Sequence, residues 1–325
     1  IDMELQREVE KIIEEELQKQ IVNRGESPNL DRAYVVMIDP NTGEILAMAG
    51  KQYVKNSETG KYEMRDAALG TFTSSYEVGS VVKGATVLTG YMTGDLKPGE
   101  VLIDEPLKIK GTKPKSSWFN RYQRIPMSDL FALEKSSNSY MWKVALKVAG
   151  GQYVPNEPIV NNPEAFDIFR NHYAQFGLGV PTGIDLPGES SGLTGNDTTP
   201  GFLLDLVIGQ FDTYTTMQLA QYISTIANDG YRVQPHIMKE IREPTNDQES
   251  LGPILFEKET NVLNRIDATQ AQIEHVQKGF YRVYHSPDGT AYDQFKNAPY
   301  NAAGKSGTAE TYVDGELNYN TTLIG

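Results

Sequence analysis

The sequence contains no cysteine among its 325 residues. Disulfide bonds, thiolate nucleophiles and thiolate metal ligands are therefore excluded from any account of its function. Long hydrophobic runs are also missing, because no apolar stretch approaches the roughly 20 residues that a membrane-spanning helix needs. The apolar and charged fractions, 39% and 22%, are those of an ordinary globular protein with a sizeable core.

Positive charge is in short supply. The chain has 30 lysine and arginine residues against 43 aspartate and glutamate residues, which gives a formal net charge of −13. Such a chain is a poor candidate for binding nucleic acid or an anionic membrane surface. The acidity is most simply explained as an aid to solubility. We therefore expect no nucleic-acid partner.

Patterns for metal or phosphate binding are also absent. The string Gly304-Lys305-Ser306 imitates the end of a P-loop, but Pro299 stands where the first glycine is needed, so no phosphate cradle can form. The four histidines do not share the i,i+4 spacing that places two imidazoles on one helix face. They are His172, His236, His275 and His285. We therefore expect no metal site.

The first fifty residues predict a helix followed by a hairpin. Apolar residues recur at helical spacing between residues 5 and 17 and follow Asp2, a favourable N-cap, which predicts an amphipathic helix over residues 3–20. Residues 33–38 and 44–48 are rich in strand formers and flank the turn sequence Asp-Pro-Asn-Thr-Gly. They predict an antiparallel pair of strands.

Later patterns place helices in the middle of the chain and strands at its end. Residues 151–200 predict loop with short helices, and residues 243–253 predict an exposed loop. The order of elements indicates a mixed α/β fold in one domain, with helices flanking a central antiparallel sheet whose first and last strands meet. The predicted helices are 129–133, 139–148, 215–227 and 268–280, and the predicted strands are 302–312 and 318–324.

Three short strings are the strongest candidates for chemistry. Residues 80–83 form a Ser-x-x-Lys string, residues 136–138 form a Ser-x-Asn string, and residues 305–308 read Lys-Ser-Gly-Thr. A helix starting near Ser80 brings residues three apart onto one face, so Lys83 would lie beside Ser80. The strings therefore predict a serine with a neighbouring lysine.

A catalytic serine needs help from its surroundings, because its hydroxyl is a weak nucleophile. Lys83 can act as the base if its pKa falls toward neutrality, which burial and the nearby charge of Lys305 would both cause. The helix start would also supply N–H groups for an oxyanion beside Ser80. The remaining motif residues could relay a proton (Ser136), orient the lysine (Asn138) and hold a carboxylate (Lys305, Thr308).

Each string alone has a simpler explanation. A Ser-x-x-Lys string arises about once by chance in a chain of this length, and Ser80 alone would be a helix cap beside a solvated Lys83. A Ser-x-Asn string is more often a turn or cap, and a lone Lys305 is more often solvated. The joint occurrence, with one match to each string in the required order, is what favours a catalytic serine.

With these motifs, the sequence resembles the transpeptidase domain of class B penicillin-binding proteins. Residues 76–83 are similar to that family's Glu-Pro-Gly-Ser-x-x-Lys, although Val78 replaces the usual proline. Residues 176–189 are similar to its Phe-Gly-Leu-Gly and Thr-Gly-Ile-Asp-Leu-Pro-Gly-Glu stretch, and residues 218–237 to its segment ending in Pro-His. Residues 39–44 resemble its first hairpin turn. The resemblance therefore spans nearly the whole chain.

The resemblance implies the penicillin-binding fold and a D,D-transpeptidase reaction. Ser80 would attack the D-Ala-D-Ala bond of a peptidoglycan stem peptide, and a β-lactam would acylate the same serine. Lys83 would be the base, Ser136 would carry the proton to the leaving nitrogen, and Asn138 would contact substrate and Lys83. The N–H groups of Ser80 and Thr308 would form the oxyanion hole. The expected substrate-binding residues are Lys305, Ser306, Gly307 and Thr308. No cofactor or metal is implied.

The same resemblance implies a cellular setting. The expected location is the extracytoplasmic face of a bacterial cell membrane, with a membrane-embedded glycan polymerase as partner and a role in cell elongation. We expect the chain to be one transpeptidase domain over residues 1–325. An N-terminal transmembrane anchor and pedestal, and the C-terminal end of the domain, are expected to lie outside the sequence.

A second departure from the family pattern and two alternatives accompany this interpretation. Phe211 stands where the family usually has the last glycine of Gly-Gln-Gly, which would change packing or substrate access. A class A β-lactamase is the main rival, because residues 157–161 fit its deacylating Glu-x-x-x-Asn. Glu157 follows Ser136 too closely for that family, so an ordinary loop acid is preferred. A β-lactam sensor domain also stays open.

Overall fold

The computed structural model describes residues 1–22, 29–246 and 250–325. The chain forms two compact units, each assembled from segments far apart in sequence. Unit 1 consists of Ile1–Ser75, Pro181–Ser191 and Thr215–Asn264, and unit 2 consists of Tyr76–Val180, Gly192–Tyr214 and Arg265–Gly325. The assignment of residues 1–325 to one domain stays a prediction.

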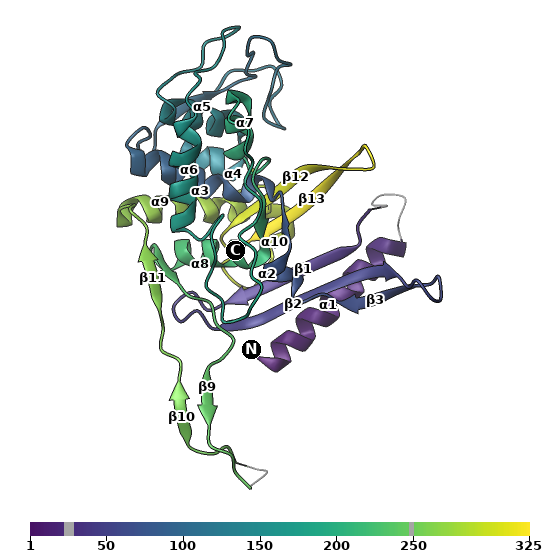
Figure 1. Ribbon diagram of the computed structural model, residues 1–325. Coiled ribbons are helices and arrows are strands. Elements are labelled where there is room, and N and C mark those ends of the chain that lie inside the picture. The colour runs from purple at the N-terminus through teal and green to yellow at the C-terminus, as the bar shows by residue number, and fades with distance from the viewer. Residues whose placement is uncertain (23–28, 247–249) are drawn as a thin grey trace. The chain divides into compact units, whose positions relative to one another are not determined.

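Unit 1 is built on a three-stranded antiparallel sheet. Strand β1 (Arg32–Ile38) pairs with β2 (Ile45–Lys55), which pairs with β3 (Tyr62–Asp66). Helix α1 (Met3–Val22) runs along this sheet, as Figure 1 shows. The predicted helix and hairpin are therefore confirmed, whereas β3 was not predicted.

Both faces of this sheet are covered by apolar side chains. On one face, Ile13, Leu17 and Ile21 of α1 pack against Ala49 of β2. The other face meets α2 (Gly70–Thr73) and α8 (Thr216–Ala227), whose residues Phe72 and Met217 join Ile45, Met48 and Ile184 in a buried cluster. Burial of such side chains stabilises the unit by about 1.5–3 kcal/mol each.

The remaining strands of unit 1 form small ladders. Strand β8 (Tyr231–Val233) pairs with β11 (Val262–Arg265), and β9 (Glu240–Arg242) pairs with β10 (Ile254–Glu257). The predicted loop 243–253 connects β9 to β10, and its residues 247–249 lie outside the described residues. The two-residue strands β4 (Ser75–Tyr76) and β7 (Tyr214–Thr215) lie where the chain passes between the units.

Unit 2 is organised around helix α3 (Lys83–Thr93). Every residue from Lys83 to Tyr91 is buried, which is possible because α3 is surrounded by other helices. Its neighbours are α4 (Asp129–Glu134), α5 (Asn138–Val148), α6 (Glu164–Gln175) and α9 (Gln270–His285). The unit also contains α7 (Pro200–Leu206), α10 (Tyr292–Phe295) and the paired strands β5 (Val101–Asp104) and β6 (Ile125–Ser128).

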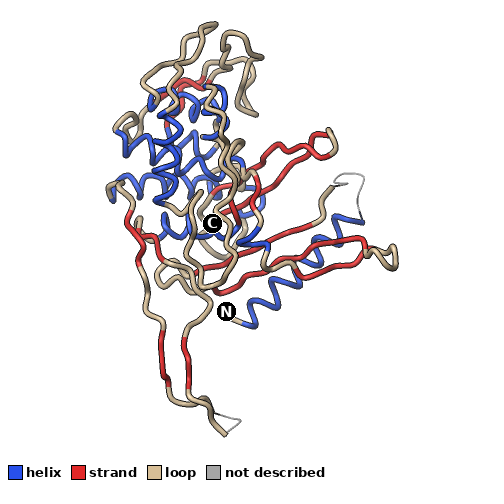
Figure 2. The backbone as a smooth tube through the Cα atoms, in the orientation of Figure 1, coloured by secondary structure: helices blue, strands red, loops and turns tan. Residues whose placement is uncertain are grey.

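A long two-stranded ribbon completes unit 2. Strands β12 (Lys305–Val313) and β13 (Glu316–Ile324) pair antiparallel, with Thr308 opposite Thr321, and run side by side in Figure 2. Strand β12 also contacts η1 (Gly79–Val82), a 3₁₀ turn that leads into α3. The ribbon therefore carries the residues of the third string to the turn that carries Ser80.

Two expectations differ from the observed fold. The predicted single sheet, whose first and last strands meet, is not seen in the hydrogen-bonded ladders of the described residues, which place β1 and β13 in different sheets. A two-residue period locates strands but does not choose their partners. The region 151–200 also contains a full 12-residue helix, α6, whose buried Phe166, Phe169 and Tyr173 hold it in the core.

Candidate active site

Ser80 lies in the 3₁₀ turn η1, directly before α3. The sequence predicted an α-helical first turn, whereas α3 begins only at Lys83. The tighter turn serves the same purpose, because three residues per turn place positions i and i+3 in line. The backbone N–H of Lys83 donates to the Ser80 carbonyl. The lysine therefore follows the serine by one turn, on the same side of the chain.

The Lys83 side chain is completely buried beside the second string. Its Nζ donates to the Ser136 carbonyl at 2.8 Å, to Ser136 Oγ at 3.2 Å and to Asn138 Oδ1 at 2.5 Å. A nitrogen with three acceptors at these distances is held in one position. The structure thus brings the first and second strings together, as predicted.

The electrostatic environment of Lys83 favours its neutral form. Burial is the main cause that lowers the pKa of Lys83 well below its ordinary value, and the charge of Lys305 lowers it further, while Asp104 opposes both. Burial also lowers the pKa of Lys305 to about 7, and its Nζ donates to the Ser306 carbonyl at 2.9 Å. Burial and the neighbouring Lys305 charge therefore both favour the neutral amine of Lys83, which is the form a general base requires.

The Ser136 backbone adopts a left-handed conformation, with φ of 56°. This geometry is rare outside glycine and is tolerated only where the surroundings hold it. Here Ser136 N–H donates to the Leu133 carbonyl and Ser137 N–H to the Ala132 carbonyl, which closes the C-terminus of α4. The turn separates α4 from α5 and directs the Ser136 carbonyl at Lys83.

Strand β12 presents its free edge to the serine turn. Glu310 N–H, which points away from β13, donates to Gln210 Oε1 at 3.0 Å. Because N–H groups alternate between the two edges of a strand, the Thr308 N–H faces the same edge as that of Glu310. The backbone at Gly307 and Thr308 passes so close to the turn that a Cβ at Gly307 would lie 2.5 Å from the Val78 carbonyl. The edge of β12 that carries the Thr308 N–H therefore lies against the turn that carries Ser80, which is the approach that the predicted oxyanion hole requires.

A cleft of about 340 Å³ lies in front of these groups. Three of the predicted site residues line it: Ser80, Asn138 and Thr308. Three others are buried: Lys83, Ser136 and Lys305. The Ser306 hydroxyl is hydrogen-bonded to Thr290 Oγ1 at 2.6 Å. The other lining residues, which sequence reasoning missed, are Lys115, Ser116, Trp142, Asp205, Ile208, Gln210, Glu310 and Tyr319. Gln210 belongs to the Gly-Gln-Gly-like string at residues 209–211, although no role was predicted for it, and the other residues belong to no string that the sequence analysis identified.

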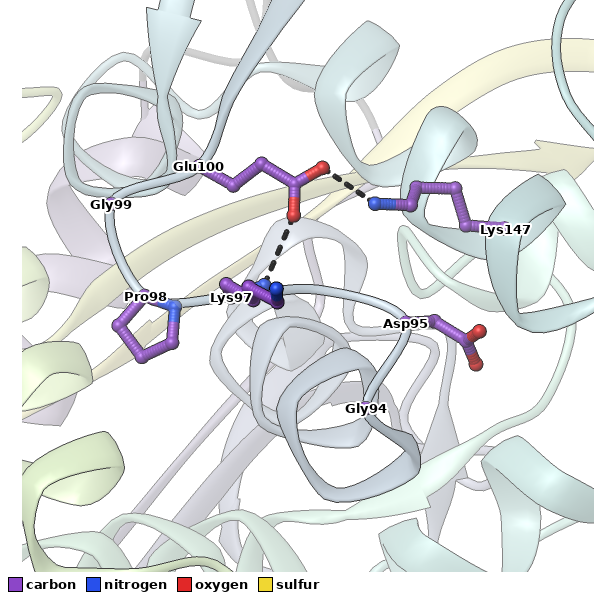
Figure 3. Close-up of a pocket in the computed structure, with 7 residues that line it drawn as sticks. All are labelled: Gly94, Asp95, Lys97, Pro98, Gly99, Glu100 and Lys147. Atoms are coloured by element: carbon purple, nitrogen blue, oxygen red, sulfur yellow. Dashed lines mark hydrogen bonds and ion pairs between the residues drawn. The ribbon is translucent and has the colours of Figure 1, made fainter.

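A larger hollow, of about 540 Å³, lies at the C-terminal end of α3 (Figure 3). It is lined by residues 94–95, residues 97–100 and Lys147. The Lys147 Nζ donates to Glu100 Oε1 at 2.5 Å, and the Lys97 N–H donates to the other oxygen of Glu100. The Glu100 carboxylate is therefore already bonded, and no hydroxyl side chain among the described residues lines the hollow, so we assign it no chemistry.

The remaining sequence predictions have clear places in the structure. Glu157, the residue that a class A β-lactamase interpretation would need, is exposed in a loop and is not part of the cleft lining. Phe211 stacks on Phe202 with ring centroids 4.8 Å apart and lies 5.9 Å from Phe166. The departure at Phe211 is therefore accommodated in packing, while its neighbour Gln210 lines the cleft.

Two further features concern metals and membranes. Within residues 1–22, 29–246 and 250–325, no three His, Cys, Asp or Glu side chains are grouped to hold a metal ion. Among the same residues, no helix is both long enough and apolar enough to cross a bilayer.

Comparisons with known proteins identify the family of the chain. The penicillin binding protein transpeptidase domain matches residues 33–325. Penicillin-binding protein 2A of Bacillus subtilis is 48% identical over 332 residues, covering 100% of this chain and 45% of the relative. Penicillin-binding protein 2B of Streptococcus pneumoniae is 36% identical over 330 residues, covering 100% and 48%.

A solved structure of one of these relatives has the same fold. The solved structure of penicillin-binding protein 2B from Streptococcus pneumoniae strain R6 superposes with a TM-score of 0.91 at 34% identity, covering 98% of this chain and 52% of that chain. The chain thus spans about half the length of the relatives it matches. By family match, sequence identity and fold, it belongs to the penicillin-binding protein transpeptidase family, in its class B branch.

Proposed function

We propose that this chain is a serine D,D-transpeptidase that cross-links peptidoglycan stem peptides through an acyl-Ser80 intermediate. The observation that carries the proposal is the buried Lys83 amine, one turn after Ser80 and held by Ser136 and Asn138. A relative named peptidoglycan D,D-transpeptidase FtsI, from Escherichia coli, is 35% identical over 161 residues, 49% of this chain. Its name supports the choice of reaction.

The first half of the reaction forms the acyl-enzyme. Ser80 Oγ attacks the carbonyl carbon of the D-Ala-D-Ala bond while Lys83 Nζ takes the hydroxyl proton. The N–H groups of Ser80 and Thr308 stabilise the oxyanion of the tetrahedral intermediate. Ser136 Oγ, 3.2 Å from Lys83 Nζ, passes a proton to the leaving nitrogen. The C–N bond breaks and D-alanine departs, leaving an ester on Ser80.

The second half transfers the acyl group. An amine of a second stem peptide attacks the ester carbonyl, loses a proton through the same Lys83 and Ser136 pair, and expels Ser80 Oγ, which regains its hydrogen. A β-lactam enters at the first step, because its strained amide imitates the dipeptide bond. Ring opening keeps the leaving nitrogen tethered in the cleft, which blocks the second amine and leaves a long-lived ester.

We assign the substrate carboxylate to the third string. Thr308 is exposed at the cleft, so its hydroxyl can contact the carboxylate directly. Lys305 is buried behind the strand and acts through its charge. A bound carboxylate favours the protonated form of Lys305, and that charge in turn favours neutral Lys83. Substrate binding and activation of the base are then linked, with Ser306 and Gly307 supporting the strand.

The proposed setting is the extracytoplasmic face of a bacterial cell membrane. Names of the relatives support a cell-wall function, and the chain covers about half of each relative, so the anchor and pedestal are proposed to belong to the longer protein. A membrane-embedded glycan polymerase is the proposed partner, and cell elongation the proposed process.

The direct test is covalent labelling by benzylpenicillin. We expect a mass increase equal to the whole antibiotic, because ring opening loses no atoms, and peptide mapping should place it on Ser80. Ser80→Ala should abolish the adduct, whereas Ser116→Ala, at another serine of the same cleft, should keep it. An adduct on a different residue, or none at millimolar antibiotic, would contradict the assignment.

A second test separates this function from a β-lactamase. We expect the turnover number for nitrocefin to be well below roughly 1 s⁻¹, the lower end of typical enzyme turnover numbers. The reason is that the acids lining the cleft are Asp205, whose carboxylate is paired with Lys115 at 2.7 Å, and the surface residue Glu310. Glu157→Gln should leave the rate unchanged. Steady turnover at tens per second would favour the β-lactamase.

A further inference from the structure

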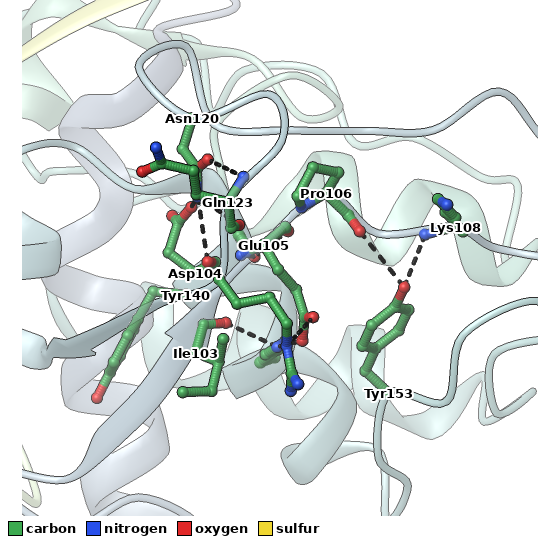
Figure 4. A network of polar contacts seen from close by, with 12 residues as sticks. Ile103, Asp104, Glu105, Pro106, Lys108, Asn120, Gln123, Tyr140 and Tyr153 are labelled. Carbon is green, nitrogen blue, oxygen red and sulfur yellow. Dashed lines mark hydrogen bonds and ion pairs between the residues drawn. The ribbon is translucent and has the colours of Figure 1, made fainter.

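Asp104 is a completely buried carboxylate that the proposed reaction does not use. It ends strand β5, and its Oδ2 accepts hydrogen bonds from Ser117 Oγ at 2.6 Å and from Ser137 Oγ at 2.5 Å. Its Oδ1 accepts from Asn120 Nδ2 at 2.7 Å, a contact drawn in Figure 4. Burial of a carboxylate costs free energy unless its oxygens are hydrogen-bonded, and here both oxygens of Asp104 have partners that offset this cost.

The two serines connect this carboxylate to the start of α5. Ser117 Oγ accepts from the N–H groups of Asn138 and Ser139, both at 3.1 Å. Ser137 Oγ accepts from the Tyr140 N–H at 2.9 Å. Because each hydroxyl has one proton and already accepts from an amide, its own proton is left for Asp104. The carboxylate therefore faces the N-terminus of α5 through two hydroxyls, where the helix dipole favours negative charge.

This network lies directly behind the second string. Ser137 is the middle residue of that string, and its neighbours Ser136 and Asn138 supply the three acceptors of Lys83 Nζ. The strained φ of Ser136 needs support of this kind. A tether from Asp104 to Ser137 thus fixes the segment whose other side holds the base.

Asp104 also acts on Lys83 through its charge. Two charged side chains influence the Lys83 amine: Lys305 on β12, which lowers its pKa, and Asp104 at the end of β5, which raises it. The hydrogen-bond acceptors of the amine are uncharged: the Ser136 carbonyl, Ser136 Oγ and Asn138 Oδ1. Burial is the largest influence on the pKa of Lys83, and the charges of Lys305 and Asp104 adjust that pKa in opposite directions.

We propose that Asp104 is a positioning residue for the reaction of Ser80. Through Ser117 and Ser137 it holds Ser136 and Asn138 against the Lys83 amine, and its negative charge opposes that of Lys305. This inference rests on the proposed function of the site, because it assigns Asp104 to the same acylation step.

The test is the pH dependence of acylation in Asp104→Asn. The second-order rate with nitrocefin should rise with pH as Lys83 loses its proton. We call this rise the acid limb of the pH profile. Without the negative charge of Asp104 the Lys83 ammonium is less stable, so the acid limb should move to lower pH by roughly half a unit to one unit. The plateau rate should fall about tenfold, because an amide in place of the carboxylate turns a donor toward either Asn120 or the serines.

Matched variants separate charge from structure. Asp129 is another completely buried acid of unit 2, bonded to the Gly99 N–H and to His275, and it does not act on Lys83. Asp129→Asn should leave the acid limb in place. Ser137→Ala keeps the Asp104 charge but breaks one link, so its plateau rate should fall several-fold without a downward shift of the limb.

Each outcome decides the inference. The inference is overturned if Asp104→Asn folds but the acid limb of its pH profile stays in place. It is also overturned if the acid limb shifts by the same amount in Asp129→Asn. If Asp104→Asn does not fold, Ser117→Ala and Ser137→Ala carry the test, and wild-type rates in both overturn it. Failure of the proposed function looks different, because the unaltered 325-residue chain would then not be acylated at Ser80.

Discussion

Replacement of Lys83 by methionine should lower the rate of Ser80 acylation by about 10³-fold. Removal of a general base typically costs 10²–10⁴-fold, and here the amine is the group bound by both Ser136 and Asn138. Methionine nearly matches lysine in length, so the buried volume is kept. The measurement is the second-order rate constant with a chromogenic β-lactam, followed by stopped flow.

The pH profile gives this prediction a sharper readout. Lys83 is active as a base only when neutral, and burial places its pKa below the ordinary value near 10.4. The acylation rate of the unaltered protein should therefore rise with pH through the folded-state pKa of Lys83 and then level off. Lys83→Met should lack that limb. A limb that persists in Lys83→Met would belong to another group, such as Lys305, whose pKa is about 7.

Lys51→Met is the matched control for loss of a buried lysine. Lys51 lies in unit 1, is 8% exposed and is paired with Glu10 and Glu14. Its replacement removes these ion pairs, and Lys51 is not a lining residue of the cleft, so acylation should stay within a few-fold of the original rate. Near-normal acylation in Lys83→Met, with both variants folded by urea titration, would show that Lys83 is not the base.

The geometry of the candidate catalytic strings could be predicted in part because local spacing decides much of it. Ser80 and Lys83 are three residues apart, so any helical turn places them on one side, and the 3₁₀ turn found here does so as well as an α-helix. The convergence of Ser136, Asn138 and Lys305 on that pair was inferred from the joint occurrence of three strings. The hydrogen bonds to Lys83 and the effect of Lys305 on its pKa are consistent with that inference.

The rest of the site could not be predicted because it depends on long-range packing. Asp104 and Ser117 are common residue types without a string, and only the fold places them behind Ser137. Gln210 lies 100 residues from its partner Glu310. In the same way, strand β3 and the pairing of the sheets depend on partners that a two-residue period does not identify.

Gly79→Ala should lower acylation by roughly 10²-fold or more, although it changes no catalytic group. Gly79 has φ of +63°, and an added Cβ would lie 2.4 Å from the Thr308 carbonyl oxygen. A Cβ cannot lie so close to a carbonyl oxygen, so β12 and the Ser80 turn must separate. That separation misaligns the two N–H donors of the oxyanion, and loss of one such donor typically costs 10²–10³-fold.

Gly94→Ala isolates this effect from ordinary glycine strain. Gly94 has φ of +80° at the C-terminus of α3, but an added Cβ would meet nothing within 4 Å. Both variants therefore incur the cost of a left-handed alanine, about 1–2 kcal/mol, which urea unfolding can measure. Only Gly79→Ala adds the clash with Thr308. Equal acylation rates in the two folded variants would mean that contact between β12 and the serine turn does not align the oxyanion donors, whereas a selective loss in Gly79→Ala identifies that contact as part of the catalytic geometry.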